Sequence, residues 1–334
     1  MAAAKKVPEP EMLKIFCHSC RQKLDVTNLK AFDEITCPTC GVKLIVPKWF
    51  NTYLLEQKCG AGGAAIVYRS LDLTLDREIA IKIFEECDNS PEFSKIFLHE
   101  GRIAASLNHR SIVPIYSCGQ FEGRCFLIMQ YMTKGSLKEQ VKQHSPLKIA
   151  QVLTWILDIT SALDAAFKAG VIHHDVKPAN ILLDSGNNAK LTDFGLSYAL
   201  HDVQSQDLLS ELSSYGSPDY VSPEKLIDGF EDEKGDVFSL GVTLYELLTA
   251  GKPFKQADED DDILVVRRSA PVIEPHRLRP EISIKLSRFI MRMLQDAASE
   301  RPDYEEITAE LKVFRNRYKK HEDKFHYRFI AKHL

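Results

Sequence analysis

Three polar residues in the stretch VIHHDVKPANILLD, residues 171–184, have the types and the spacing for chemistry on phosphate. Asp175 is followed by Lys177 two residues on and by Asn180 five residues on, between two apolar runs. The Asp suits the acceptance of a proton from an attacking hydroxyl, and the Asn offers magnesium a neutral oxygen ligand. The Lys can offset the negative charge that develops on a transferred phosphoryl group. The stretch therefore indicates phosphoryl transfer.

Further groups that this chemistry needs lie on either side of the stretch. Asp193, in LTDFGL eighteen residues after Asp175, supplies a carboxylate that can bridge magnesium to the phosphates of ATP. Lys82 ends the alternating run IAIK and is a candidate for gripping the α- and β-phosphates. Glu100, eighteen residues later, is a candidate for holding the Lys82 ammonium group. Taken singly, a surface Lys and a solvated Glu are the simpler interpretation.

A glycine-rich stretch, GAGGAAIVY at residues 60–68, lies between two predicted strands. Gly60 and Gly62 let backbone N–H groups approach the phosphates closely, because these positions carry no side chain. Val67 would then lie over the base of the nucleotide. Alone this pattern is weak, because glycine-rich hairpins are common.

The elements that must position these groups follow from the hydrophobic pattern. Period-two alternation and β-branched residues predict an antiparallel sheet with strands at 53–60, 65–72, 77–86, 113–121 and 125–132. One helix, at 91–108, interrupts this sheet and carries Glu100. After Gly135 the pattern becomes helical, with predicted helices at 150–170, 236–251, 283–295 and 303–320.

These motifs, in this order, resemble the eukaryotic-type protein kinase family, including its bacterial serine/threonine members. The resemblance covers roughly residues 50–315 and includes GSPDYVSPE at 216–224, where Ser-Pro-Glu stands for the usual Ala-Pro-Glu. It implies that Asp236 braces the catalytic loop and that Arg301 pairs with Glu224. The implied fold class is α+β, with two lobes: a small β-rich N-lobe and a mainly helical C-lobe.

The resemblance also implies where ATP and magnesium bind. The implied catalytic residues are Lys82, Glu100, Asp175, Lys177 and Asn180. The implied nucleotide-binding residues are Gly60, Gly62, Val67, Ala80, Lys82, Gln130, Met132, Asn180 and Asp193, of which Asn180 and Asp193 bind magnesium. Gln130 and Met132 would offer backbone hydrogen bonds to adenine. Because Lys177 is typical of serine/threonine kinases, we expect transfer of the γ-phosphate of ATP to Ser or Thr hydroxyls of proteins.

Two positions depart from the family pattern. The third glycine of the loop is replaced by Ala65, for which we expect a modest effect on nucleotide affinity. His174 stands where the family has an Arg that binds a phosphorylated activation segment, and histidine is shorter and charges only near pH 6–7. We hypothesise that activity does not depend strongly on phosphorylation between Asp193 and Glu224. The candidate autophosphorylation sites in that segment are Ser213, Ser214 and Ser217.

Two other interpretations of the phosphoryl-transfer residues stay open. A pseudokinase scaffold would bind nucleotide without turnover, although Lys82, Asp175 and Asp193, the groups such proteins usually lose, are all present. A small-molecule phosphotransferase with a related fold is the second alternative. The activation-segment sequence at 216–224 favours a protein substrate instead.

Four cysteines near the N-terminus form a second chemical pattern. Cys17, Cys20, Cys37 and Cys40 make two C-x-x-C pairs with 16 residues between them, which suits tetrahedral thiolate coordination of zinc. The module resembles a zinc ribbon with a structural metal, and iron or a pair of redox disulfides is the lesser interpretation. We expect it to be a structural cap or a protein-docking module. Nucleic-acid binding is disfavoured, because its basic residues are few and are not interleaved with aromatic ones. The scattered cysteines are expected to be reduced core residues: Cys59, Cys87, Cys118 and Cys125.

Length and composition limit the class of protein. The 334 residues carry a net charge of -4, which gives no field that would draw in nucleic acid or a membrane. The sequence has no run of about 18 uncharged apolar residues and no apolar signal-peptide core at its start, so we expect no membrane span and a cytoplasmic protein. The expected domains are a flexible leader at 1–12, a zinc ribbon at 13–48, an N-lobe at 49–132, a C-lobe at 133–315 and a basic tail at 316–334.

Overall fold

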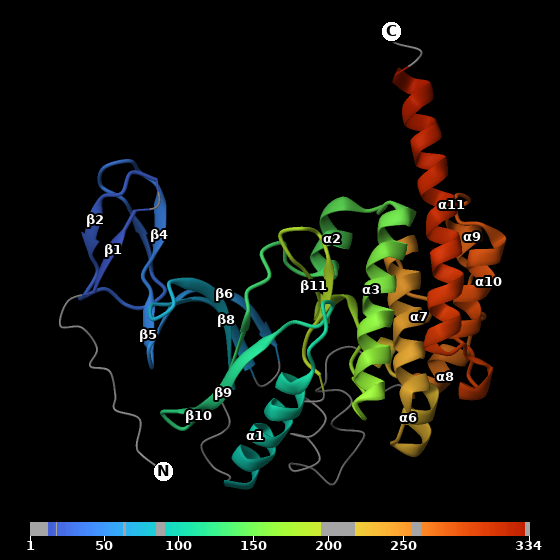
Figure 1. The fold of residues 1–334 in the computed structure, drawn as a ribbon, viewed down its shortest axis with the longest axis horizontal. Helices are drawn as coiled ribbons and strands as arrows, with labels where there is room; N and C mark the ends of the chain where they lie inside the picture. Colours follow the sequence, from blue (N-terminus) through green and yellow to red (C-terminus); the bar gives the residue numbers. More distant parts are fainter. Residues whose placement is uncertain are drawn as a thin grey trace. The chain divides into compact units, whose positions relative to one another are not determined.

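The computed structural model describes residues 13–17, 19–62, 65–84, 91–194, 218–255 and 262–330, and the chain forms two compact units. One unit contains the chain up to Arg102 together with Pro114–Tyr131, and the other contains Ile103–Val113 and the chain from Met132 onward. The first unit is rich in strands and the second is mainly helical (Figure 1). The α+β class is therefore confirmed.

The cysteine module consists of two short antiparallel hairpins. Its strands are β1 (Lys14–Phe16) paired with β2 (Lys23–Asp25), and β3 (Glu34–Thr36) paired with β4 (Lys43–Ile45). The turn of each hairpin contains one C-x-x-C pair. The backbone N–H of Arg21 donates to the carbonyl of Cys17, and that of Gly41 donates to the carbonyl of Cys37, each at 2.9 Å. Both donors have positive φ, which Gly41 adopts without steric cost.

The sheet of the β-rich unit has six antiparallel strands in the order β5-β6-β7-β8-β10-β9. Their bounds, with those of the one long helix of this unit, are β5 (Lys48–Phe50), β6 (Tyr53–Gly62), β7 (Ala65–Asp72), β8 (Arg77–Phe84), α1 (Pro91–Ser106), β9 (Ile115–Phe121) and β10 (Arg124–Gln130). The sequence predicts all of these except β5, which it treats as a linker. Phe50 makes this segment a strand of the sheet, because its ring packs edge-on against Phe121 and Phe126.

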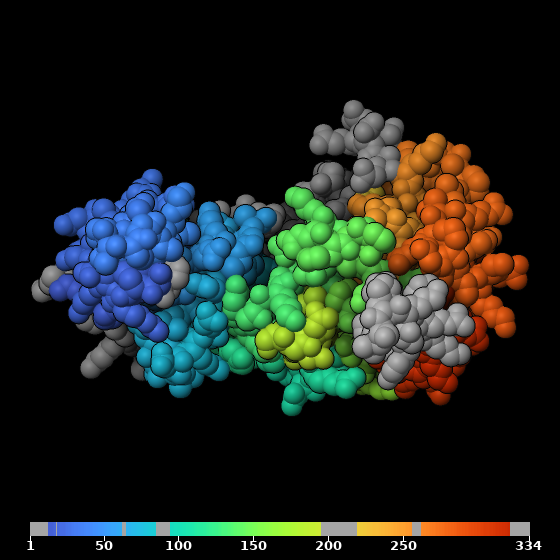
Figure 2. Space-filling model, turned by 90° about the horizontal axis from the view of Figure 1, so that it is seen from above, coloured from blue at the N-terminus to red at the C-terminus, as the bar shows by residue number. Residues whose placement is uncertain are grey.

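The two faces of this sheet carry different side chains, because successive residues of a strand point to opposite sides. One face is an apolar cluster formed by Phe50, Leu55, Tyr68, Ile79, Ile81, Ile83, Phe126 and Ile128. Phe32 of the cysteine module stacks on Tyr68 of this cluster, with the ring centroids 5.3 Å apart. The module and the strands accordingly form one continuous surface at the blue end of the chain (Figure 2). On the other face Phe84 packs edge-on against Phe97 of α1.

The helical unit is organised around α3 (Ile149–Lys168), which packs against α7 (Glu233–Thr249) and α11 (Tyr304–Ile330) (Figure 1). The remaining elements are α2 (Leu137–His144), η2 (Pro178–Asn180), β11 (Ile181–Leu183), β12 (Ala189–Leu191), η3 (Pro218–Tyr220), α6 (Pro223–Asp228), α8 (Ile263–Arg268), α9 (Pro275–Leu278), α10 (Ile284–Met293) and η4 (Ala298–Glu300). The predicted long helices are confirmed. The last of them, α11, continues to Ile330. Most of the predicted basic tail at 316–334 is therefore part of this helix.

One described helix, α3, is long and apolar enough to cross a membrane. However, 67% of its most apolar window is buried inside the folded unit. A core helix of a folded domain has the same length and composition, so α3 is only weak evidence for a membrane span.

Cys125 on β10 corrects the expectation for the scattered cysteines, because it is disulfide-bonded. Cys59 and Cys118 form no disulfide, as expected, but Cys59 is exposed and Cys118 is half-buried, so neither is a core residue. Cys87 lies outside the described residues. Which sulfurs meet depends on the distance between their backbones in the fold, and sequence spacing does not contain that distance.

Candidate active site

Asp175, Lys177 and Asn180 meet on the loop that leads from α3 to β11 in the helical unit. The Lys177 ammonium group lies 2.8 Å from Oδ2 of Asp175. The Asn180 amide donates to the same oxygen at 2.8 Å and to the Asp175 carbonyl at 2.9 Å. The short helix η2 turns the chain so that Asn180 faces back towards Asp175. The structure thus gathers three of the predicted residues around one carboxylate, and 30% of the Asp175 side chain stays exposed for a reacting group.

Asp236 of α7 holds the backbone immediately before Asp175. Its two carboxylate oxygens accept the backbone N–H groups of His173 and His174, each at 2.8 Å. Asp236 is buried, and this burial raises the pKa of its carboxyl, while the nearby His173 opposes the rise. The bracing role implied by the family resemblance is confirmed.

His173 connects this loop to the residues before Asp193. Its Nδ1 accepts the backbone N–H of Asp175 at 3.1 Å, so Nε2 carries the ring proton and donates to the Thr192 carbonyl at 2.9 Å. Asp193 follows directly, with φ 67°, a left-handed conformation that is uncommon for a residue with a side chain. No role for His173 was predicted from the sequence. Its position two residues before Asp175 was the available signal.

The second predicted pair of the helical unit is also present. Arg301 donates to both carboxylate oxygens of Glu224, at 2.6 and 2.7 Å. Arg301 is buried, and Glu224 lies in the first turn of α6. The pairing implied by the resemblance is confirmed, and it ties the segment around Glu224 to the segment before α11.

In the β-rich unit, five predicted nucleotide-binding residues share one face of the sheet. Lys82 on β8 is opposite Val67 on β7, and Val67 is opposite Gly60 on β6. Ala80 is two residues from Lys82 on the same strand, and Gly62 is two residues from Gly60. Directly paired residues and residues two apart point to the same side. This face is the one opposite the apolar cluster that contacts Phe32.

For the other predicted residues the structure gives the element or the unit in which each lies. Glu100 lies on α1, and its pairing with Lys82 stays a prediction. The backbone N–H of Gln130 donates to the Pro114 carbonyl at 3.0 Å, so an adenine contact there would use the Gln130 carbonyl. Met132 belongs to the helical unit, where its side chain is buried.

The four cysteine sulfurs of the N-terminal module lie within 4.8 Å of one another. Cys17 and Cys40 are 3.6 Å apart, and Cys20 and Cys37 are also 3.6 Å apart. A tetrahedral zinc site with bonds of about 2.3 Å requires sulfurs about 3.8 Å apart. The cluster therefore has the dimensions of such a site.

The electrostatics of this cluster favour a cation. The backbone N–H of Cys20 lowers the pKa of the Cys17 thiol. Desolvation raises the pKa of Cys37, but backbone N–H groups and neighbouring thiols outweigh it and lower that pKa to about 6. The backbone N–H of Gln22 lowers the pKa of Cys20, yet desolvation and the other thiols raise it to about 12. A negative charge on one sulfur thus makes ionisation of a neighbouring thiol less favourable. A bound divalent cation would offset the repulsion between the thiolates.

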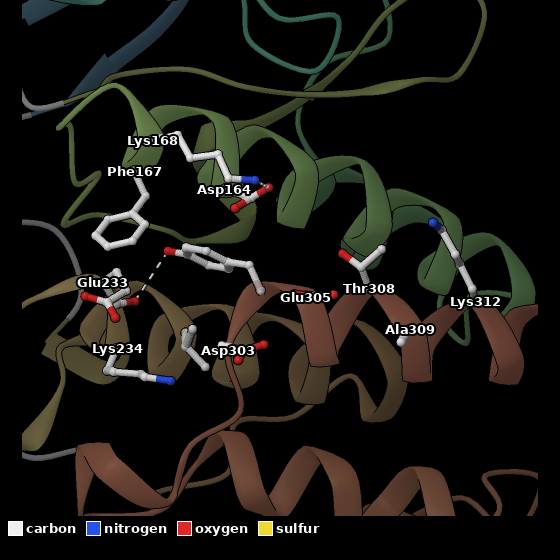
Figure 3. Close-up of a pocket in the computed structure, with 12 residues that line it drawn as sticks. Asp164, Phe167, Lys168, Glu233, Lys234, Asp303, Glu305, Thr308, Ala309 and Lys312 are labelled. Atoms are coloured by element: carbon white, nitrogen blue, oxygen red, sulfur yellow. Dashed lines mark hydrogen bonds and ion pairs between the residues drawn. The ribbon is translucent and has the colours of Figure 1, made fainter.

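A pocket of about 530 Å³ lies between α3, α7 and the start of α11 (Figure 3). Two of its charged lining residues pair with each other: Lys168 lies 2.7 Å from Asp164. The Tyr304 hydroxyl donates to the backbone carbonyl of Glu233 at 3.3 Å. Because the predicted site residues are not among those that line it, we assign this pocket no part in the chemistry.

The three candidate autophosphorylation sites lie in residues 195–217, outside the described part of the chain: Ser213, Ser214 and Ser217.

Comparison with known proteins adds an independent finding. Residues 53–311 match the family described as the protein kinase domain, so the match begins after the cysteine module. The chain is 34% identical to the serine/threonine-protein kinase PrkC of Bacillus subtilis over 250 residues, which are 75% of this chain and 38% of that protein. It is 37% identical to the serine/threonine-protein kinase PknL of Mycobacterium tuberculosis over 205 residues, 61% of this chain and 51% of the relative. It is 31% identical to the serine/threonine-protein kinase PknB of Mycobacterium leprae over 253 residues, which are 74% of this chain and 40% of that protein. The chain spans between 38% and 51% of the length of these relatives.

Proposed function

Because the chain belongs to the protein kinase family, we propose that it transfers the γ-phosphate of ATP to Ser or Thr hydroxyls of protein substrates. One observation carries the proposal: Asp175, Lys177 and Asn180 converge on a backbone that Asp236 holds. In this proposal Asp175 accepts the proton of the attacking hydroxyl, and Lys177 offsets the charge that develops on the γ-phosphate. The serine/threonine kinases among the relatives favour Ser and Thr as acceptors.

We propose Asn180 and Asp193 as the magnesium ligands. Since the Asn180 NH₂ group donates to Asp175, its amide oxygen is directed elsewhere and suits a hard cation. Bound magnesium would neutralise charge on the β- and γ-phosphates. The sheet face with Gly60, Gly62 and Lys82 is proposed to hold the phosphates. The residues proposed around the base are Val67, Ala80, Gln130 and Met132.

We further propose a structural zinc ion bound by Cys17, Cys20, Cys37 and Cys40. The spacing of the sulfurs and the opposed thiol ionisation support it. Phe32 on Tyr68 supports a role for this module as a cap on the sheet, and docking of other proteins through the module is the second proposed role. The domain limits at 13–48, 49–132 and 133–315, and a cytoplasmic location, belong to the same proposal.

Autophosphorylation with labelled ATP, followed by mapping of the modified residues, tests the proposed reaction. The wild-type chain is expected to label Ser or Thr, and Asp193→Ala is expected to lose the label because it removes a magnesium ligand. Nucleotide binding without any transfer in the wild type would favour the pseudokinase alternative. Labelling of a small hydroxyl compound but not of protein would favour the small-molecule alternative.

A further inference from the structure

We propose that Glu231 is a positioning residue for the catalytic loop, which it holds through His174. This inference deepens the proposed function, because it concerns the residue directly before Asp175. His174 Nδ1 lies 3.0 Å from Oε1 of Glu231, although the two residues are 57 positions apart in the sequence. The His174 side chain is only 17% exposed and that of Glu231 only 2% exposed, so water competes little for this contact.

Glu231 is held in place by two more donors. The Ser222 hydroxyl donates to its Oε2 at 2.6 Å, and the Lys225 ammonium group lies 3.0 Å from its Oε1. Burial raises the pKa of Glu231, but the hydrogen bonds from His174 and Ser222 and the charge of Lys225 outweigh burial and lower that pKa. Glu231 is therefore a fixed carboxylate within the helical unit.

Gly235 supplies an independent sign that this carboxylate is built into the fold. A Cβ placed on Gly235 would come closer than 3.0 Å to Oε2, Cδ and Cβ of Glu231. Only a residue without a side chain leaves this space for the carboxylate. Gly235 directly precedes Asp236, so the helix that braces the loop backbone also accommodates Glu231.

The loop before Asp175 is thus held from two sides. Asp236 accepts the backbone N–H of His174, and Glu231 binds the His174 side chain. His174 has φ 66°, a left-handed conformation that a residue with a side chain keeps only when its surroundings fix it. Glu231 provides that fixation from inside the chain. An anion is consequently present at His174 without any phosphate on the activation segment, which gives a physical basis for activity that does not depend on phosphorylation.

The test compares the steady-state kinetics of phosphatase-treated full-length variants. Glu231→Gln keeps the shape of the side chain and removes its charge. His174→Asn tolerates left-handed backbone but is too short to reach Glu231, and it leaves the bonds of Glu231 to Ser222 and Lys225 intact. Glu233→Gln makes the same chemical change two residues away and serves as the matched control.

For each single variant we expect kcat to fall about tenfold with KM for ATP within about twofold of wild type, the scale of one charge-assisted hydrogen bond. The double variant is expected to lose no more than the stronger single variant, because the two residues act as one unit. The control is expected to keep the wild-type kcat. Thermal unfolding is measured on every sample. If Glu231→Gln does not fold, the kcat of His174→Asn tests the inference.

A kcat in His174→Asn equal to that of the control would overturn the inference. Losses that simply multiply in the double variant would also overturn it, since independent residues behave in that way. A wild-type chain that binds ATP but transfers no phosphate would overturn the proposed function itself, and that outcome is read before any variant is compared.

Discussion

The shape of the Arg301 side chain contributes more to the stability of the helical unit than its charge does. The buried guanidinium donates to both oxygens of Glu224 and also to the backbone carbonyls of Gln295 and Asp296. Lysine carries the same charge but lacks the planar fork that makes these bonds together. We predict that Arg301→Lys lowers the free energy of unfolding of the helical unit by about 3 kcal/mol, measured by urea denaturation.

Arg268→Lys is the control for this prediction. Arg268 pairs with Asp296 at 3.2 Å, but both side chains are more than half exposed. Exposed ion pairs contribute about 0–1 kcal/mol, so the expected change in stability is small. Equal losses in the two variants would show that the buried fork of Arg301 has no special role.

The chemistry of single residues was predictable where the partners lie close in the sequence. Asp175, Lys177 and Asn180 fall within six positions, so their types and spacing were enough to predict that they act together. Glu231 was not predictable as a partner of His174. Its contact depends on how α6 and α7 pack, and nothing in the sequence near His174 indicates a carboxylate 57 residues away.

Among the elements, the cysteine module is predicted to stabilise the sheet through Phe32. Its ring stacks on Tyr68 of the apolar cluster, and removal of a packed aromatic ring leaves a cavity. We predict that Phe32→Ala lowers the free energy of unfolding of the β-rich unit by about 2 kcal/mol. Phe16→Ala is the matched control, because Phe16 is in the same module but 60% exposed. Equal effects of the two variants on Tm would contradict the capping role.

Metal binding by the cysteine module is tested with Cys37→Ser. Cys37 is a buried member of the sulfur cluster, so its loss is expected to abolish stoichiometric zinc and to lower Tm. Cys59→Ser removes an exposed thiol outside the cluster and is expected to retain the zinc. Zinc content is measured by atomic absorption on freshly purified protein. Full zinc occupancy in Cys37→Ser would exclude the proposed four-sulfur site.

Strands and helices were predicted well where the apolar period is long, as in α3 and β8. The short strand β5 was missed, because three residues do not form a period, its first residue is the polar Lys48 and the polar Asn51 directly follows its end. Packing of Phe50 between two other aromatic rings determines this strand, and such tertiary contacts are not contained in a local pattern.

For the whole molecule, the proposed reaction draws on both units. The sheet contributes Lys82, and the helical unit contributes Asp175 and Asp193. In the proposed function Lys82 binds phosphate, and Asp175 and Asp193 supply the proton acceptor and a magnesium ligand. We predict that Lys82→Met lowers kcat/KM by at least about a hundredfold while the Tm of the chain stays near that of wild type. An active Lys82→Met chain would contradict the assignment of the sheet face to the phosphates.

The two-unit architecture was predicted through the family resemblance, which implies two lobes, and the run of strands followed by a run of helices agrees with it. That the cysteine module joins the β-rich unit was not predictable. The stacking of Phe32 on a residue of β7 contributes to it, and the spacing of the cysteines specifies the metal site alone.

The turnover of Asp175→Asn tests the central claim most directly. The substitution keeps the size of the side chain but removes the proton acceptor, so kcat for phosphate transfer is predicted to fall by about 10²–10⁴-fold. Asp164→Asn serves as the control: it also removes one carboxylate paired with a lysine, on the surface of α3, and is predicted to keep the wild-type rate. A wild-type rate in Asp175→Asn would contradict the assignment of the catalytic base.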